Sequence, residues 1–329
     1  MQTLLFFTPV LAAIWLANRA QQRPELRAFL LTYLTLLSLG GLALGTGTAI
    51  AGLVSAISLQ GLGAMLAGQE AGNLTLGGAV MSVCAALAMI ALTPPAARLA
   101  ARAIPIDPAQ PVHLAALSLT ALAFGFNLFQ TIALLPAALS AFSSGTAPEI
   151  GLTYLDVLAF PLLTLLLSGL LGVGWLTRRN QDETLARLGL RIPTIREVAI
   201  AVAASAALIA LAAATEALWR VIDPSGLERI GGLSQALLGN MQGLAGAVAI
   251  GLAAGLGEEF FFRGAYQPRM GLALTTLLFA SFHTQYGLTP ATALVVIVSL
   301  VLGVMRQRLS LSACIITHFT YNFVLVLLG

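Results

Sequence analysis

Long apolar runs separated by short polar segments make up most of the chain. An α-helix needs about 20 apolar residues to cross the hydrocarbon core of a bilayer, so these runs predict membrane-spanning helices. We expect them near residues 1–18, 28–46, 76–96, 112–140, 155–176, 198–218, 243–267, 270–288, 290–305 and 311–328. The pattern predicts an all-α, polytopic membrane protein with eight to ten transmembrane helices.

Two segments near the N-terminus are harder to interpret. Residues 46–75 are rich in glycine and weakly polar, which is compatible with an outer loop, a re-entrant piece or an extra short helix. The first run lacks a preceding basic region and is followed by arginines, so we expect a first membrane helix rather than a cleaved signal.

Composition supports the membrane assignment and adds an orientation. Hydrophobic residues make up 58% of the chain and charged residues only 9%, and every basic residue is an arginine. The arginines cluster at 19–27, 98–102, 178–196, 263–269 and 306–308, in alternate connections of the ten-run scheme. By the positive-inside rule these connections are cytoplasmic and both termini lie outside. We therefore expect a multi-pass protein of the prokaryotic cell membrane and no nucleic-acid partner.

The connection at 219–240 breaks this charge pattern, because it carries arginines on the side expected to lack them. Glu216 and Arg220 have the i, i+4 spacing of a helical ion pair, and we expect an interfacial salt bridge there. The charged loop at 177–197 is the best candidate for a boundary between the two parts of the chain.

Isolated polar residues in the first part of the chain have modest expected roles. His113 follows Pro111 at a helix start, and we expect a local or interfacial contact. Asn127 lies inside the fourth run, and we expect it to bond to a neighbouring helix. Cys84 and Cys314 lie in separate apolar runs and have no metal-binding or redox spacing, so they are expected to be small packing residues.

The polar groups of the last part of the chain carry the chemistry. Glu258 and Glu259 stand together in an apolar run, where an ionised side chain needs a partner or a function. Arg263 lies one helical turn after Glu259, so we expect these two to form an ion pair and Glu258 to stay free. Gly251 and Gly255 predict close packing of this helix against a neighbour, and Pro268 is expected to bend or end it.

Two further spans supply histidines and an amide. Phe279 and His283 share the i, i+4 spacing, as do His318 and Asn322. Counting a rise of about 1.5 Å per residue from the arginines at the span ends, Glu258, His283, His318 and Asn322 reach similar depths near the middle of the bilayer. The sequence therefore predicts an active site inside the helix bundle.

These motifs resemble the CPBP family, also called ABI, of intramembrane glutamic endopeptidases, which includes the type 2 CAAX prenyl protease. The family pattern is matched by Glu258-Glu259-x-x-x-Arg263, by Phe279-x-x-x-His283 and by His318-x-x-x-Asn322, in that order. The resemblance covers residues 198–329 and divides the chain. We expect membrane helices of unknown role over 1–197 and a CPBP-like intramembrane protease domain over 198–329.

The resemblance implies a peptidase in which Glu258 and His283 bind and activate a water while His318 and Asn322 form an oxyanion hole. The residue types support the same roles, since peptide hydrolysis needs a base for the attacking water and donors where negative charge develops. Glu259, neutralised by Arg263, would orient rather than react. The expected substrate is a membrane-associated peptide or protein, lipidated or not, in contact with the lipid bilayer.

Two alternatives stay open. Glu258, His283 and His318 also form a plausible zinc ligand set with an open fourth position, although we expect no cofactor. A non-catalytic transporter or scaffold, as in bacteriocin immunity, could use the same polar pocket to bind ions or a partner. The sequence leaves the oligomeric state open.

Overall fold

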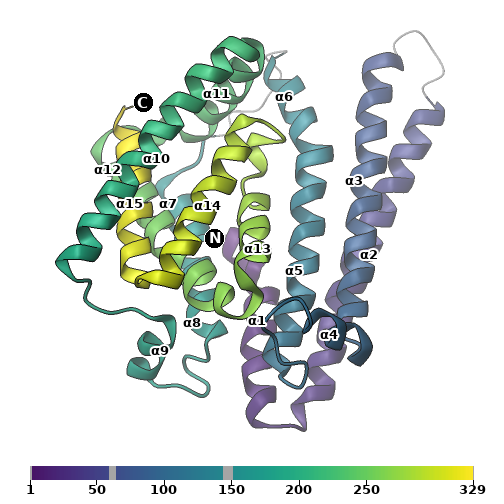
Figure 1. Cartoon of the computed structure of the whole chain (residues 1–329). Coiled ribbons are helices and arrows are strands. Elements are labelled where there is room, and N and C mark those ends of the chain that lie inside the picture. Colours follow the sequence, from purple (N-terminus) through teal and green to yellow (C-terminus); the bar gives the residue numbers. More distant parts are fainter. Residues whose placement is uncertain (1, 59–63, 144–150, 329) are drawn as a thin grey trace.

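The computed structural model describes residues 2–58, 64–143 and 151–328, and every regular element in these ranges is a helix (Figure 1). Eight helices in these ranges are long and apolar enough to cross a membrane. They are Leu26–Ala56, Gln69–Ala91, Pro111–Phe142, Tyr154–Gly172, Ile195–Ile222, Gly243–Ser281, Pro290–Arg308 and Leu311–Leu328. The prediction of an all-α polytopic membrane protein is confirmed at the lower end of the expected helix count.

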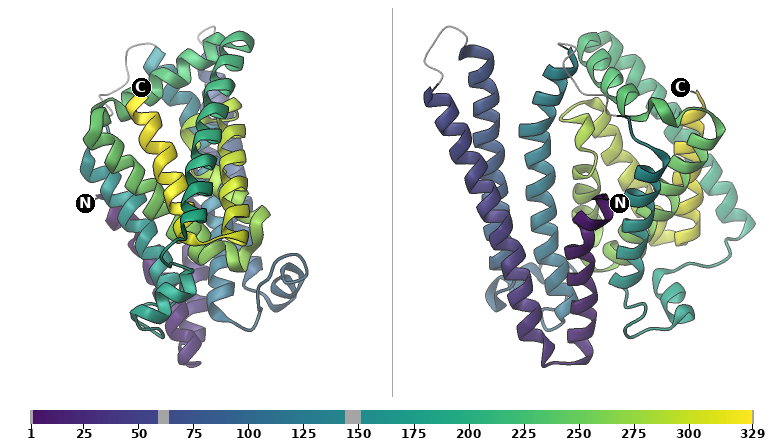
Figure 2. Two further views of the ribbon diagram at one scale, coloured as in Figure 1. Left: turned by 60° about the vertical axis from the view of Figure 1, so that its left-hand side comes forward. Right: turned by 180° about the vertical axis from the view of Figure 1, so that it is seen from behind.

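Helices α2 and α3 form a long hairpin beside the rest of the bundle (Figure 1; Figure 2). The elements are α1 (Gln2–Gln22), α2 (Leu26–Ser58), α3 (Ala64–Ala91), α4 (Pro94–Ala100), α5 (Pro111–Phe129), the π-helical η1 (Gln130–Leu134) and α6 (Leu135–Ser143). Close approach of α2 and α3 requires glycine: a Cβ at Gly45 would lie 2.8 Å from the carbonyl oxygen of Gly78. Helix α5 packs against α3 and α13 and so joins the hairpin to the remaining helices.

This hairpin corrects the interpretation of residues 46–75. The apolar run expected to end near residue 46 continues as helix α2 to Ser58, and α3 already begins at Ala64. Glycine and alanine allow the two helices to touch along this length, so these residues are paired helix, while 59–63 lie outside the described residues. The first run, 1–18, forms α1 but is not among the eight spans.

The middle of the chain alternates spans with short capped helices. The elements are α7 (Tyr154–Val157), the π-helical η2 (Leu158–Thr164), α8 (Leu165–Gly172), α9 (Gln181–Leu188), α10 (Ile195–Ile222), α11 (Pro224–Leu238) and η3 (Gly239–Met241). Capping boxes at Asn180 and Thr194 start α9 and α10. Asp223 caps α11, so the connection expected over 219–240 is mostly helix. The predicted Glu216–Arg220 ion pair is confirmed at 2.5 Å.

The last elements and the residues between them include all the predicted site residues. The elements are α12 (Gly243–Leu252), the π-helical η4 (Ala253–Glu258) and η5 (Phe260–Tyr266), α13 (Gln267–Ser281), η6 (Thr284–Tyr286), α14 (Pro290–Arg308) and α15 (Leu311–Leu328). Their core contains Phe262, Met270 and Phe279, which are nearly fully buried.

The candidate span Gly243–Ser281 is folded back on itself at Gly271. The rings of Phe262 and Phe279 lie 5.0 Å apart, whereas a straight helix would separate these residues by about 25 Å. The reversal needs a positive φ of 77° at Gly271, which glycine adopts without steric cost. Pro268, expected to break the helix, sits in the first turn of α13, so the break comes after it. Two separate runs were therefore the right prediction, but the second helix ends at Ser281 rather than 288.

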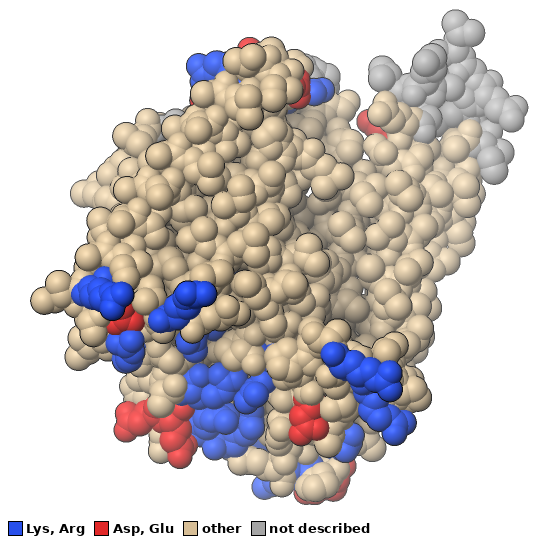
Figure 3. All heavy atoms as spheres, viewed as in Figure 1, with Lys and Arg blue, Asp and Glu red and all other residues tan. Residues whose placement is uncertain are grey.

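The arginines gather mainly at one end of the bundle. Figure 3 shows most of them at the end where α4 and α9 lie in Figure 1, with a smaller group at the opposite end beside α11. The C-terminus lies away from the arginine-rich end (Figure 1). The expected orientation, with the arginines cytoplasmic and both termini outside, stays a prediction.

Candidate active site

The helix that carries the two glutamates is held closely on one side by α15. A Cβ at Gly255 would lie 2.9 Å from the Phe319 Cβ and 3.0 Å from the carbonyl oxygen of Ile315. At Gly251 it would approach the Phe319 ring to 3.0 Å. The predicted tight packing through this glycine pair is therefore confirmed, and it brings Glu259 next to the helix that carries His318.

The first part of the chain holds the same helix from the other side. A Cβ at Gly257 would overlap the carbonyl oxygen of Pro161 in η2, and one at Gly169 in α8 would lie 2.8 Å from the Phe260 backbone. Both glutamates lie where π-helical turns meet, and such turns are frequent at functional sites. Backbone contacts on two sides thus fix the direction in which the adjacent glutamates point.

Glu259 is the centre of a fully buried charged network. Its Oε1 atom lies 3.1 Å from Nη1 of Arg263 and 2.8 Å from Nδ1 of His318. The side chains of Glu259 and Arg263 are both 0% exposed, so neither charge has water as a partner. The predicted ion pair is confirmed, and one carboxylate oxygen also accepts a hydrogen bond from the histidine.

Arg263 is held by two further helices. Its Nη2 atom donates to the Ser299 hydroxyl at 3.0 Å and to the Ser299 carbonyl at 3.2 Å, both on α14. Its guanidinium carbon lies 4.4 Å from the centre of the Phe279 ring on α13, a cation–π contact. Arg263 therefore ties three helices together around the Glu259 carboxylate.

Glu258 differs from its neighbour because its carboxylate remains unpaired. The residue is partly exposed, yet its Oε2 atom is buried and has no hydrogen-bond partner among the described residues. Burial and, to a smaller extent, the charge of Glu258 raise the pKa of Tyr286, in the segment that follows α13. A buried acceptor without a partner is costly, so a water or a substrate group is expected there. Glu258 is thus free for chemistry, as the spacing predicts.

His283 lies just beyond the end of α13 rather than within a helix. Its Nδ1 atom is 2.9 Å from the carbonyl oxygen of Phe279. A carbonyl can only accept, so Nδ1 carries the hydrogen and Nε2 of the neutral ring keeps its lone pair. The ring stacks on Tyr286 with centroids 6.1 Å apart. His283 therefore presents the lone pair of Nε2 beside Tyr286.

His318 and Asn322 lie on α15, but their hydrogen bonds differ from the simple pair expected. Nδ1 of His318 is bonded to Glu259, which leaves Nε2 for a ligand. Asn322 donates one amide hydrogen to the backbone carbonyl of His318 at 3.1 Å. The second amide N–H of Asn322 and Nε2 of His318 have no partner of this kind among the described residues. Their joint donation to one substrate oxygen stays a prediction.

The structure brings the three motifs together through Phe279. Its ring centroid lies 4.8 Å from that of His283 and 5.8 Å from that of His318, and its face covers Arg263. This contact explains why an aromatic residue at this position belongs to the motif. Within the described residues, no three His, Cys, Asp or Glu side chains are grouped as metal ligands.

Sequence reasoning missed several residues that support the site. Tyr286 and Ser299 have no motif that would single them out. On α5, Asn127 donates to the Ser281 hydroxyl at 3.0 Å, two residues before His283. This confirms the expected bond of Asn127 to another helix and shows what it positions. His113 accepts from the backbone N–H of Asp107 at 2.9 Å, a local role as predicted.

Comparison with known proteins agrees with the motifs. The family model of type II CAAX prenyl endopeptidase Rce1-like proteins matches residues 240–324. The match covers 85 of the 329 residues and is a likeness of this segment to CAAX-protease-like proteins. The segment contains all six predicted site residues and leaves residues 1–239 outside the match. No curated protein and no solved structure matches the chain. This likeness supports a CAAX-protease-like intramembrane peptidase at the level of the family.

Proposed function

We propose that this CAAX-protease-like protein hydrolyses a peptide bond inside the helix bundle, using a water activated by Glu258 and His283. The observation that carries the proposal is the contrast between the two adjacent carboxylates. Oε1 of the fully buried Glu259 lies in an ion pair with Arg263 and accepts from His318, although its Oε2 has no hydrogen-bond partner, whereas neither oxygen of Glu258 has a hydrogen bond or an ion pair within the described residues. One glutamate supports the site and the other is available to react.

The reaction follows from the free atoms. Glu258 takes a proton from water while Nε2 of His283 accepts a hydrogen bond and orients it. The water oxygen adds to the peptide carbonyl carbon, and the carbonyl oxygen takes the negative charge. The intermediate collapses with cleavage of the C–N bond, and Glu258 returns the proton to the departing amine. Atoms and charge balance without a further reactant.

His318 and Asn322 are assigned to the oxyanion. Because Nδ1 of His318 donates to Glu259, Nε2 can also donate only when the ring is doubly protonated. The second N–H of Asn322 is the other donor. Preorganised donors of this kind act where charge develops in the transition state.

The proposed substrate is a membrane-associated peptide or protein, lipidated or not. The site residues lie on the folded-back span, just beyond its end at His283, and on the last span, so a substrate has to reach them within the helix bundle. We place the protein in a prokaryotic cell membrane, where such peptides and membrane-protein segments are available.

The test is cleavage of a peptide library in detergent by wild type, Glu258→Gln and the control Glu216→Gln. Removal of a general base lowers the rate by about 100-fold to 10,000-fold. We expect that loss for Glu258→Gln with unchanged expression and topology. Glu216, in an exposed ion pair on α10, should tolerate the same change. Full cleavage by Glu258→Gln would remove Glu258 from the mechanism.

A zinc peptidase on the same residues is the second candidate. Glu259 bonded to Nδ1 of His318 is the arrangement that orients a metal-binding histidine through its other nitrogen. Glu258, His283 and His318 are not grouped as metal ligands in the described part of the chain, so they would have to move together to hold the ion. Metal analysis of the same samples separates the two mechanisms, because loss of cleavage in a chelator with recovery in zinc would establish the metal. If Glu258→Gln changed only transport or partner binding, the non-catalytic alternative would replace both.

A further inference from the structure

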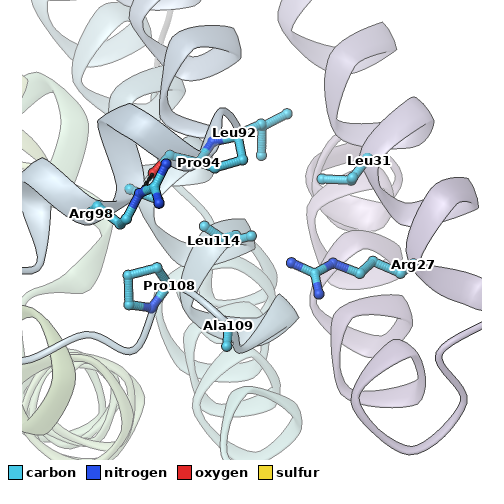
Figure 4. A pocket seen from close by; sticks show the side chains of 9 residues that line it. Arg27, Leu31, Leu92, Pro94, Arg98, Pro108, Ala109 and Leu114 are labelled. Atoms are coloured by element: carbon cyan, nitrogen blue, oxygen red, sulfur yellow. Dashed lines mark hydrogen bonds between the residues drawn. The ribbon is translucent and has the colours of Figure 1, made fainter.

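A pocket of about 270 Å³ opens at the arginine-rich end of the bundle, away from the residues of the candidate active site (Figure 4). It lies between α2, the end of α3, α4 and the start of α5. Arg27 and Leu31 line it from α2, and Arg98 lines it from α4. Leu92 and Leu114 complete the apolar part of its wall.

The pocket lies at the level where three spans end. The span Leu26–Ala56 begins one residue before Arg27, and Gln69–Ala91 ends one residue before Leu92. The span Pro111–Phe142 begins just after the lining residue Ala109. If these helices cross the bilayer as their length and composition indicate, the pocket opens at the boundary between hydrocarbon and water.

Two guanidinium groups face this opening without an acidic partner. Figure 4 shows the side chains of Arg27 and Arg98 extending toward one another from opposite walls. Arg98 donates from Nε to the Pro94 carbonyl at 3.2 Å, which leaves its two terminal nitrogens. Among the described residues, the ion pairs involve other arginines and neither of these two.

Asp107, in the loop that leads to the lining residues Pro108 and Ala109, is already engaged. Its carboxylate accepts from the backbone N–H of Ala109 at 2.9 Å and from the Gln110 amide at 3.1 Å. These hydrogen bonds, first the one from Ala109, hold the pKa of Asp107 below its usual value. The carboxylate is thus kept charged by its own loop and forms no ion pair with the arginines of the pocket.

We propose that this pocket binds the phosphate headgroup of an anionic glycerophospholipid. Guanidinium groups at the interface suit a phosphate oxygen, because their planar N–H donors form paired hydrogen bonds with it. Leu31 lies one helical turn from Arg27 toward the membrane interior, where the glycerol and the first acyl carbons would contact it. The volume is small for a ligand enclosed whole, and it fits a headgroup whose chains stay in the bilayer.

Native mass spectrometry of the full chain in detergent tests the proposal. The probes are phosphatidylglycerol and phosphatidylcholine with identical acyl chains, each titrated with and without inorganic phosphate. The variants are Arg27→Gln/Arg98→Gln, the charge-conserving Arg27→Lys/Arg98→Lys, and the control Arg196→Gln/Arg308→Gln. The control removes two exposed arginines that lie outside the lining.

We expect wild type to prefer phosphatidylglycerol, and Arg27→Gln/Arg98→Gln to bind it roughly 30-fold more weakly, at the level of phosphatidylcholine. The lysine variant should keep most of the binding, and the control should keep all of it. All variants should retain the thermal unfolding of wild type, since the mutated side chains are exposed.

Three results would overturn the proposal. Unchanged phosphatidylglycerol binding by Arg27→Gln/Arg98→Gln would show that the lipid binds outside this pocket. Equal binding of the two lipids by wild type would show that the site does not distinguish an anionic from a zwitterionic headgroup. Displacement of phosphatidylglycerol by inorganic phosphate would identify a site for a soluble anion. The proposal is independent of peptidase activity, so neither result bears on the other.

Discussion

Replacing Arg263 by methionine tests whether the buried network carries the structure of the active site. Glu259 and Arg263 are both 0% exposed and their closest atoms are 3.1 Å apart. Methionine is unbranched and uncharged and follows most of the arginine stem, so Arg263→Met removes the cation and the bonds to Ser299 while filling most of the space. What remains is a buried carboxylate whose hydrogen-bond partner among the described residues is His318.

The magnitude follows from the geometry. At 3.1 Å and an effective dielectric constant of about 20, the gross attraction between the two charges is about 5 kcal/mol. Much of this attraction is offset by the loss of hydration, but removal of one partner leaves the other desolvated and uncompensated. Breaking a buried pair in this way costs roughly 3–5 kcal/mol. We expect a fall of that size in the free energy of unfolding.

A double variant shows whether the loss comes from the unpaired charge. Replacing both partners, as in Glu259→Met/Arg263→Met, removes the charge itself and should recover most of the stability, since apolar residues often replace a buried pair without loss. It should nevertheless not recover cleavage, because His318 loses the carboxylate that fixes its Nδ1 hydrogen. The single and double variants therefore separate stability from function.

The assay is reversible denaturant unfolding in detergent micelles, followed by peptide cleavage on the same preparations. A stability of Arg263→Met within about 1 kcal/mol of wild type would refute the reasoning, because the buried carboxylate would then not need the cation. A double variant as unstable as the single one would also refute it, since the loss would come from packing.

Two further predictions concern contacts that cross from the first part of the chain to the site. Gly257→Ala puts a Cβ against the Pro161 carbonyl and should lower the free energy of unfolding by about 1–3 kcal/mol in denaturant titrations. The control Gly40→Ala, whose Cβ would have nothing within 4 Å, should not lower it. Equal effects of the two variants would contradict the packing argument. Asn127→Ala removes the hydrogen bond to Ser281 and should slow peptide cleavage roughly threefold. The double variant Asn127→Ala/Ser281→Ala should be no slower than Asn127→Ala, because both changes remove the same bond. Additive losses would show that the two side chains act separately.

The parts of the fold that depend on local pattern could be predicted from the sequence. Apolar length places the spans because hydrocarbon thickness fixes the length of a crossing helix. The Glu259–Arg263 pair follows from i, i+4 spacing within one helix. The packing of Gly251 and Gly255 follows from the absence of side chains where helices approach. Each of these inferences uses neighbours within a turn or two.

The remaining features depend on contacts between distant residues. The bond between Glu259 and His318 joins two helices, and no spacing rule indicates which glutamate the histidine meets. The reversal at Gly271 was placed at Pro268, because proline is the stronger helix breaker, although only glycine adopts the required positive φ without strain. The sequence does not predict that residues 46–58 and 64–75 form two paired helices, because glycine favours loops over a short window. Here glycine instead allows the two helices to touch.

The contacts around the site also bear on what the first 197 residues do. The division of the chain at residue 197 stays a prediction, and the family match begins only at residue 240. Yet the backbone of Pro161 lies against Gly257, and Asn127 holds the segment that leads to His283. The helices before residue 197 thus contact the backbone next to Glu258 and the segment that leads to His283, the two reactive side chains of the proposed mechanism. If the chain is a peptidase, the part that matches the family supplies its reactive groups, and the earlier helices help fix their geometry.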